Sequence, residues 1–215
     1  MVVVVYVHPS HLDELLLERI AEKVRAGRIV VYPTDTVYGV GSNPFLEEAV
    51  LRVYRVKKRP LDKPLPVLVS SVEAAEEVVY MTREARLLAE AFWPGALTLV
   101  LRARENVPGV LHAGTGKVGV RMPDHSVALS LIDKCCGALV GTSANIHGRP
   151  APRNALEALE QLGEGVDYVI DSGPSPGGVP STVIDLAAWP PRLLREGPVS
   201  ASEIERVLGA RIVRS

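Results

Sequence analysis

Cysteine, aromatic side chains and long apolar runs are all scarce in this sequence. The only two cysteines, Cys135 and Cys136, are adjacent, which fits neither a disulfide framework nor the spacing of metal ligands. The apolar stretch Met1–Val7 is too short to cross a membrane, and it has neither a basic leader nor a small-residue cleavage site. These absences argue against disulfide-stapled secreted proteins and membrane proteins, so we expect a reduced cytoplasmic protein.

An excess of charge of either sign is also missing. Charged residues make up 23% of the chain and the formal net charge is −1, so no overall field attracts nucleic acid or an anionic membrane. Any site for an anionic ligand must therefore be local. The five histidines are scattered, and only His8 and His11 approach ligand spacing, without a clear third ligand. We therefore predict no protein-bound metal site.

Helical and strand patterns alternate along the chain. Strands are expected at Val2–Val7, Arg28–Tyr32, Pro66–Val69, Leu97–Arg102, Lys117–Arg121, Ala138–Gly141, Tyr168–Asp171, Thr182–Leu186 and Arg192–Arg195. Helices are expected at Leu12–Ala26, capped by Ser10, and at Leu46–Val56, Val72–Tyr80, Arg83–Trp93, Asp124–Cys136 and Ala155–Leu162, with a last helix capped by Ser200 and Glu203. Several connections are too short for a helical crossover, so we expect one α/β domain over residues 1–215, with helices on a twisted mixed sheet.

A polar loop follows the second expected strand. The segment Val31–Gly41 carries two threonines, a carboxylate and a phenol, and we expect a loop over Pro33–Pro44. Such a loop can hold a small polar ligand. The alternative is a turn in which Thr34 and Asp35 bond their own backbone.

A basic cluster comes next in the sequence. Its members are Arg52, Arg55, Lys57, Lys58, Arg59 and Lys63. We expect Lys57, Arg59 and Lys63 to lie beyond the helix, exposed on a proline-restrained loop. Arginine forks and lysine point charges suit a polyphosphate or carboxylate ligand. The alternative is a solvated run of charges.

Small and polar residues follow the short apolar strand that is expected at Ala138–Gly141. Gly141–Asn145, with Gly148, allows a ligand to approach the backbone closely, and Ser143 and Asn145 can donate to phosphate or ribose oxygens. An ordinary turn is the alternative here. Arg121 and Arg195 each end a strand, where sites in α/β proteins usually form. Either arginine could instead form a surface ion pair.

Taken in order, these segments resemble the YrdC-like threonylcarbamoyl-AMP synthases. The motifs that carry the resemblance are Pro33–Gly41, Lys57 with Arg59, Lys63, Arg121–His125 and Ser143–Asn145, within a match over about residues 15–195. The resemblance implies a twisted α/β sheet around a large concave basic cavity. It also implies a nucleotidyltransferase that joins bicarbonate to the amine of L-threonine and adenylates the carbamate with ATP, releasing pyrophosphate. Separate partner proteins then place the threonylcarbamoyl group on an adenosine of transfer RNA.

The resemblance implies roles for individual residues. Thr36 is expected on the threonine side, and Arg121 is expected to pair with the threonine carboxylate. The residues expected at the nucleotide are Lys57, Arg59, Lys63, Lys117, Ser143, Asn145 and Arg195, and those expected on the cavity wall are Thr34, Tyr38 and Ser181. Lys57 and Arg59 are expected to act in catalysis, by stabilising charge as pyrophosphate departs.

Two further expectations concern the chemistry. No residue is an obvious general base, because a carbamate oxygen is already an anionic nucleophile. Mg²⁺ is expected to arrive with ATP, bound through phosphates and water.

The sequence departs from the family pattern at Leu68, Lys117 and Ala151, and Lys117 adds a candidate phosphate contact. Because the sequence ends at Ser215, we also expect no gating of the cavity by the extra C-terminal domain of longer relatives.

Two other functions stay open at this point. One is a non-catalytic module that binds double-stranded RNA or transfer RNA through phosphate contacts, in which case binding should be weak and sensitive to salt. The low aromatic content, 5%, offers that alternative little support. The other is carbamoyl transfer as in the YrdC-like domains of hydrogenase-maturation proteins, which belong to much larger chains.

Overall fold

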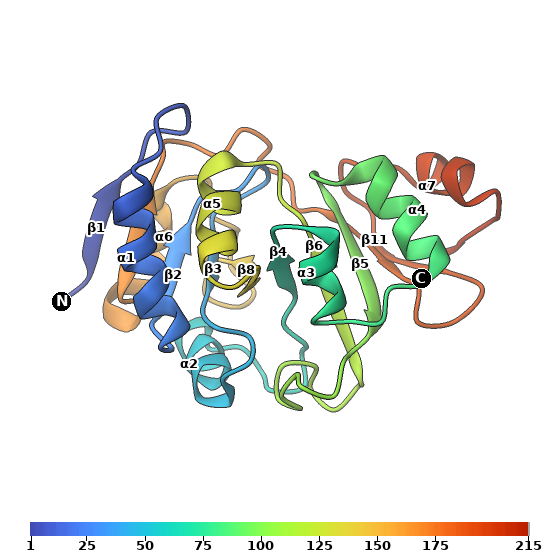
Figure 1. Ribbon diagram of the computed structural model, residues 1–215, viewed down its shortest axis with the longest axis horizontal. Helices are drawn as coiled ribbons and strands as arrows, with labels where there is room; N and C mark the ends of the chain where they lie inside the picture. Colours follow the sequence, from blue (N-terminus) through green and yellow to red (C-terminus); the bar gives the residue numbers. More distant parts are fainter. Residues whose placement is uncertain (215) are drawn as a thin grey trace.

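The computed structural model describes residues 1–214, and its strands divide between two sheets that lie side by side (Figure 1). Helices cover both sheets, which confirms the expected α/β class with mixed strand directions. The strands form two sheets, however, where the sequence suggested one. No helix within residues 1–214 is long and apolar enough to cross a membrane.

The five-stranded sheet contains the N-terminal strand at one edge. Its spatial order is β1 (Val3–Tyr6), β9 (Tyr168–Asp171), β2 (Val30–Tyr32), β3 (Gly39–Gly41) and β8 (Thr142–Ser143). The first three strands are parallel, whereas β3 runs antiparallel to both of its neighbours. The short turn between β2 and β3 contacts the second sheet, because Asp35 and Thr36 accept hydrogen bonds from Arg121 of β6 (Lys117–Arg121).

The seven-stranded sheet is also mixed. Its order is β12 (Val213–Arg214), β11 (Arg192–Arg195), β10 (Thr182–Asp185), β5 (Leu97–Arg102), β6 (Lys117–Arg121), β4 (Val67–Val69) and β7 (Ala138–Val140). Strands β10 and β5 are parallel, while β5 and β6 are antiparallel. This arrangement brings one face of β10, β5 and β6 toward the first sheet.

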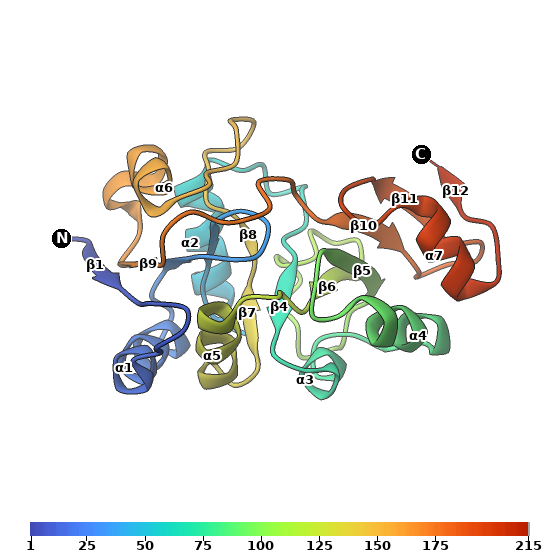
Figure 2. The same ribbon diagram turned by 90° about the horizontal axis from the view of Figure 1, so that it is seen from above.

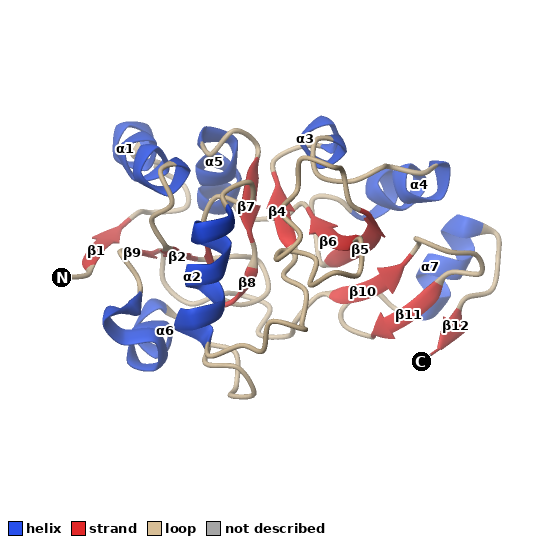
Figure 3. Cartoon of the chain, turned by 90° about the horizontal axis from the view of Figure 1, so that it is seen from below, coloured by secondary structure: helices blue, strands red, loops and turns tan. Residues whose placement is uncertain are grey.

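The helices lie on both sides of the sheets. They are α1 (Glu14–Arg25), α2 (Glu47–Lys57), α3 (Val72–Glu76), α4 (Arg83–Phe92), α5 (Ser126–Lys134), α6 (Ala155–Leu162) and α7 (Ala201–Leu208), with a 3₁₀ turn at Gly163–Gly165. Helices α1, α5, α3 and α4 form a row on one side, and α2 and α6 lie on the other (Figures 2 and 3). On α1, the buried residues Leu17, Ile20 and Val24 recur at helical spacing and pack into one cluster with α5.

The structure corrects the start of one predicted helix and adds strands that the sequence analysis missed. Asp13, not Ser10, caps α1, because its side chain accepts the N–H of Leu16 at 2.9 Å. The expected loop Pro33–Pro44 contains strand β3, whose two glycines disguise it. The two-residue strands β8 and β12 were also missed.

A close backbone crossing joins the two sheets. Strands β7 and β8 follow one another through Gly141, although they belong to different sheets. A Cβ on Gly41 of β3 would lie 1.7 Å from the carbonyl oxygen of Val140, and one on Gly141 would lie 2.3 Å from the Leu68 side chain. Any larger residue at these two positions would collide with neighbouring atoms, so both positions require glycine.

The crossing yields a test by substitution. Gly41→Ala should lower the free energy of unfolding by about 3 kcal/mol, because the new methyl overlaps backbone that cannot move independently. Gly109→Ala is the matched control, since a Cβ there meets nothing within 4 Å, and its effect should stay within about 0.5 kcal/mol. Denaturant unfolding of both variants measures the difference. Equal stabilities would contradict the close crossing.

Candidate active site

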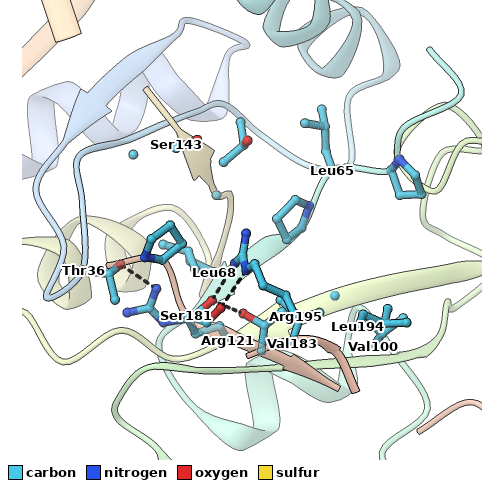
Figure 4. Close-up of a pocket in the computed structure, with 18 of the residues that line it drawn as sticks. Thr36, Leu65, Leu68, Val100, Arg121, Ser143, Ser181, Val183, Leu194 and Arg195 are labelled. Carbon is cyan, nitrogen blue, oxygen red and sulfur yellow. Dashed lines mark hydrogen bonds between the residues drawn. The ribbon is translucent and has the colours of Figure 1, made fainter. Parts of the chain in front are cut away.

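A cavity of about 610 Å³ lies where the two sheets meet, within the size range of small-molecule sites (Figure 4). Both sheets contribute to its wall. The predicted site residues on the wall are Thr34, Thr36, Arg59, Lys117, Arg121, Ser143, Ser181 and Arg195. Among the described residues, those that the structure places off the wall are Tyr38, Lys57, Lys63 and Asn145.

Arg121 ends β6 and links the two sheets at the cavity. Its Nε donates to the carbonyl of Gly95 at 2.8 Å, and its Nη1 donates to Thr36 Oγ1 at 2.9 Å (Figure 4). Its Nη2 donates to the carboxylate of Asp35, which also accepts the N–H of Asp124 at 3.2 Å. Burial lowers the pKa of Arg121, and Asp35 opposes that shift.

These contacts use three of the five N–H donors of the Arg121 guanidinium. One N–H on each Nη atom has no partner among these hydrogen bonds, and Arg121 lies on the cavity wall. Two such donors can bind the two oxygens of a carboxylate.

The loop before β3 is held by its own hydroxyls. Thr34 Oγ1 donates to the carbonyl of Val37 at 2.6 Å and accepts the N–H groups of Thr36 and Val37, each at 3.2 Å. The turn alternative from the sequence therefore holds for Thr34. Asp35 instead reaches across to the second sheet, so the loop both forms a turn and faces the cavity.

Arg195 approaches the cavity from β11. Its Nε donates to the carbonyl of Ser181 at 3.0 Å, and Ser181 Oγ lies 2.8 Å from Thr98 Oγ1 (Figure 4). Burial lowers the pKa of Arg195, and the positive charge of Arg121 lowers it further. Two guanidinium groups therefore face the same space, and an anionic ligand would relieve their repulsion.

Arg59 lines the cavity from the segment after α2. It donates through Nε to the carbonyl of Lys63 at 3.1 Å and through Nη2 to the carbonyl of Pro64 at 2.9 Å. Its Nη1 lies 3.4 Å from His147 Nδ1, and burial lowers its pKa. Arg59 thus holds its own loop while it borders the cavity, whereas the Lys63 side chain is exposed to solvent.

Lys57 is buried, which corrects the expectation that it lies on an exposed loop. It is the last residue of α2, and only 1% of it is exposed. Its Nζ donates to the carbonyl of Asn145 at 2.8 Å and to the carbonyl of Ser143. Burial, then Arg59, lowers the pKa of Lys57 to about 7. In this structure Lys57 therefore holds the backbone of the Ser143 segment and lies behind the cavity wall.

The side chains of two other predicted site residues also donate hydrogen bonds to backbone carbonyls. Asn145 is buried, and its Nδ2 donates to the carbonyls of Ile146 at 2.9 Å and Arg149 at 2.7 Å. The hydroxyl of Tyr38 donates to the carbonyl of Gly173 at 2.6 Å, and burial raises its pKa to about 12. Both residues fix loops around the cavity from behind.

Other wall residues were missed by the sequence analysis. Thr98, Val100, Val183, Asp185 and Leu194 all line the cavity. Alternation along β5 and β10 places Thr98 with Val100, and Val183 with Asp185, on one strand face each, a signal that was present in the sequence. The family departures Leu68 and Lys117 also lie on the wall, whereas Ala151 does not. Within residues 1–214, no group of three or more His, Cys, Asp and Glu residues is arranged to hold a metal ion.

The chain is similar to proteins of known name over most of its length. The Sua5/YciO/YrdC family model, described as telomere recombination, matches residues 22–197. A threonylcarbamoyl-AMP synthase of Pyrococcus abyssi is 43% identical over 201 residues, a match that covers 93% of this chain and 59% of that protein. A Mycobacterium tuberculosis relative is 44% identical over 187 residues, and the match covers 86% of each chain.

A solved structure is also similar. P. abyssi Sua5 in complex with L-threonine has a TM-score of 0.93 and 42% identity, and the match covers 98% of this chain and 62% of that one. The match therefore covers less than two thirds of the length of the P. abyssi relative, both in its sequence and in the solved structure.

The burial of Lys57 predicts how stability depends on pH. The folded protein loses the Lys57 proton near pH 7, whereas the unfolded chain keeps it until its ordinary value of 10.5. The free energy of unfolding of the natural chain should therefore rise with pH between those two values, relative to that of Lys57→Met, by an amount on the order of 5 kcal/mol. Below pH 7 the two proteins should show no such difference in slope.

Denaturant unfolding at a series of pH values measures this effect. Lys58→Met is the matched control, because Lys58 is adjacent and exposed, and its profile should parallel that of the natural chain. Parallel profiles for Lys57→Met and the natural chain would show that the buried amine does not titrate as described.

Proposed function

Because this chain belongs to the Sua5/YciO/YrdC family, we propose that it is a threonylcarbamoyl-AMP synthase, which forms threonylcarbamoyl-AMP and pyrophosphate from L-threonine, bicarbonate and ATP. The observation that carries the proposal is Arg121, which keeps two free N–H donors at a cavity wall that also bears Arg59 and Arg195. Such a wall suits one ligand with a carboxylate and a second with phosphates.

The threonine carboxylate would bind the two free donors of Arg121. Thr36 lies beside them, with its hydroxyl 2.9 Å from Arg121 Nη1. Asp35 neutralises part of the Arg121 charge and fixes its plane, so the fork is oriented before the ligand arrives. The amine of threonine then attacks the carbon of bicarbonate, and loss of water yields the carbamate.

The nucleotide would place its phosphates near Arg59, Arg195 and the Ser143 hydroxyl. A carbamate oxygen forms a bond to the α-phosphorus of ATP, and the bond from that phosphorus to the pyrophosphate oxygen breaks. The carbamate is already anionic, so this step needs positioning and charge stabilisation more than a general base. Lys57 would act indirectly, by holding the Ser143 backbone.

The donor set of the cavity fits Mg²⁺ only as a companion of ATP. The carboxylate on the wall is Asp185, and it is already bound to Lys117 at 2.8 Å. We propose that phosphate oxygens and water would hold the metal, which would supply positive charge beside the pyrophosphate.

We further propose that the protein works in the cytoplasm and that separate transfer proteins consume its product. The alternative of a non-catalytic RNA-binding module gives no reason for the buried guanidinium of Arg121 on the wall of a cavity between the two sheets, since a backbone-binding surface for RNA would expose its charges to solvent.

The proposal predicts that pyrophosphate release requires threonine and bicarbonate together. Arg59→Ala should lower turnover by about 10²–10³, the scale for losing a preorganised electrostatic contact, and Arg59→Lys should keep a substantial defect because it lacks the planar fork. Lys63→Ala is the control in the same loop and should stay near normal, because its side chain is off the wall. Equal pyrophosphate release without threonine would reject the assignment.

A further inference from the structure

Strand β1 forms one edge of the five-stranded sheet and is hydrogen-bonded on one side only. It pairs in parallel with β9, and the N–H groups of Val3 and Val7 donate to carbonyls on that side at 3.0 Å and 2.8 Å. Because alternate residues of a strand present their backbone groups to opposite edges, those of Val4 and Tyr6 point away from β9. They have no partner within residues 1–214, so two N–H donors and two carbonyl acceptors are free at this edge.

The free edge is also lined by apolar side chains. Val3, Val4 and Tyr6 are 45%, 54% and 64% exposed, although the fold buries most of its large apolar residues. The segment Met1–Val7 contains no charged residue and no proline. Charged side chains and prolines are the usual means by which an edge strand avoids pairing with another chain. Strand β1 has neither protection.

The other three sheet edges within residues 1–214 are protected. Strands β8 and β12 have only two residues each, and Arg214 belongs to β12. Strand β7 is covered along its outer side, where the N–H of Val140 donates to the carbonyl of Ser42 at 3.0 Å. Short, charged and covered edges are those that do not add a further strand. Strand β1 is therefore the edge at which this fold can accept one.

The sequence of β1 is complementary to itself. In an antiparallel pairing about a two-fold axis, the free backbone groups of Val4 face those of either Val4 or Tyr6 in the second copy. Either register forms pairs that exchange both backbone hydrogen bonds. The facing side chains are then valine with valine or valine with tyrosine, which are stabilising cross-strand pairs, and no like charges meet.

Helices on both faces of β1 can extend such a contact. Helix α1 lies on one face and α6 on the other (Figures 2 and 3), and they carry the exposed residues Leu15 and Leu156. A two-fold axis at the β1 edge places each helix beside its own copy, so the contact area is larger than that of two strands. The cavity is lined by β3 and β8 at the opposite end of this sheet, so both cavities stay open.

We propose that two copies of this chain form a two-fold dimer through antiparallel pairing of their β1 strands. The two five-stranded sheets then become one continuous sheet. An extended segment of a different protein could use the same backbone groups, but the uncharged, self-complementary strand favours a second copy. The inference does not depend on the proposed function.

Sedimentation equilibrium of the full chain over a range of concentrations tests the dimer. The mass should rise from 23.1 kDa toward twice that value, and the dimer should dominate at about 10⁻⁴ M. Val4→Lys and Tyr6→Lys should each weaken the dimer at least about tenfold, because a charge enters the joint between the strands. Leu87→Lys is the matched control, since it changes an exposed apolar residue of α4 and should leave the mass unchanged.

Hydrogen exchange then locates the contact. The amides of Val4 and Tyr6 should exchange at least about tenfold more slowly in the dimer than in the single chain, where they face solvent. Thermal unfolding confirms that the lysine variants are folded. A single-chain mass at about 10⁻⁴ M would overturn the inference and leave the edge to a different protein. A dimer that persists in both lysine variants, or one in which exchange at Val4 and Tyr6 is unchanged, would also overturn it.

Discussion

The hydrogen bonds of one buried guanidinium, Arg121, tie the two sheets together at the cavity. Arg121 comes from the seven-stranded sheet, while Asp35 and Thr36 come from the turn between β2 and β3 of the other sheet. Only 7% of the Arg121 side chain is exposed, so its charge is tolerated because Asp35 and the Gly95 carbonyl satisfy it. The contact of Arg121 with Asp35 and Thr36 thus holds the two sheets together. It also orients the Arg121 guanidinium on the cavity wall, where it can bind an anion.

The rest of the site is arranged around this contact by backbone, not by reactive side chains. Gly41 and Gly141 let the two sheets cross closely, and Lys57 holds the carbonyls of the segment that carries Ser143. The described wall residues supply charge, hydroxyls and apolar surface. This composition agrees with chemistry in which two anionic substrates are brought together and charge on a leaving group is neutralised.

Much of this could be predicted from the sequence, for physical reasons. Strand periodicity gave the bounds of β6 and β11 correctly, and with them the placing of Arg121 and Arg195 at strand ends. Lys57 was placed on the wrong side of the wall, because a run of basic residues does not show which of them is buried. Strand β3 was hidden by its two glycines, and the need for Gly41 becomes clear only once Val140 is known to pack against it. Asp185 was missed because a single carboxylate at a strand end resembles a surface residue until the neighbouring strands are known.

The most direct measurement is a crystal structure of the chain with L-threonine and a non-hydrolysable ATP analogue. The account predicts the threonine carboxylate within hydrogen-bond distance of Arg121, with the phosphates facing Arg59 and Arg195. Threonine bound away from Arg121, or phosphates bound away from Arg59 and Arg195, would contradict it.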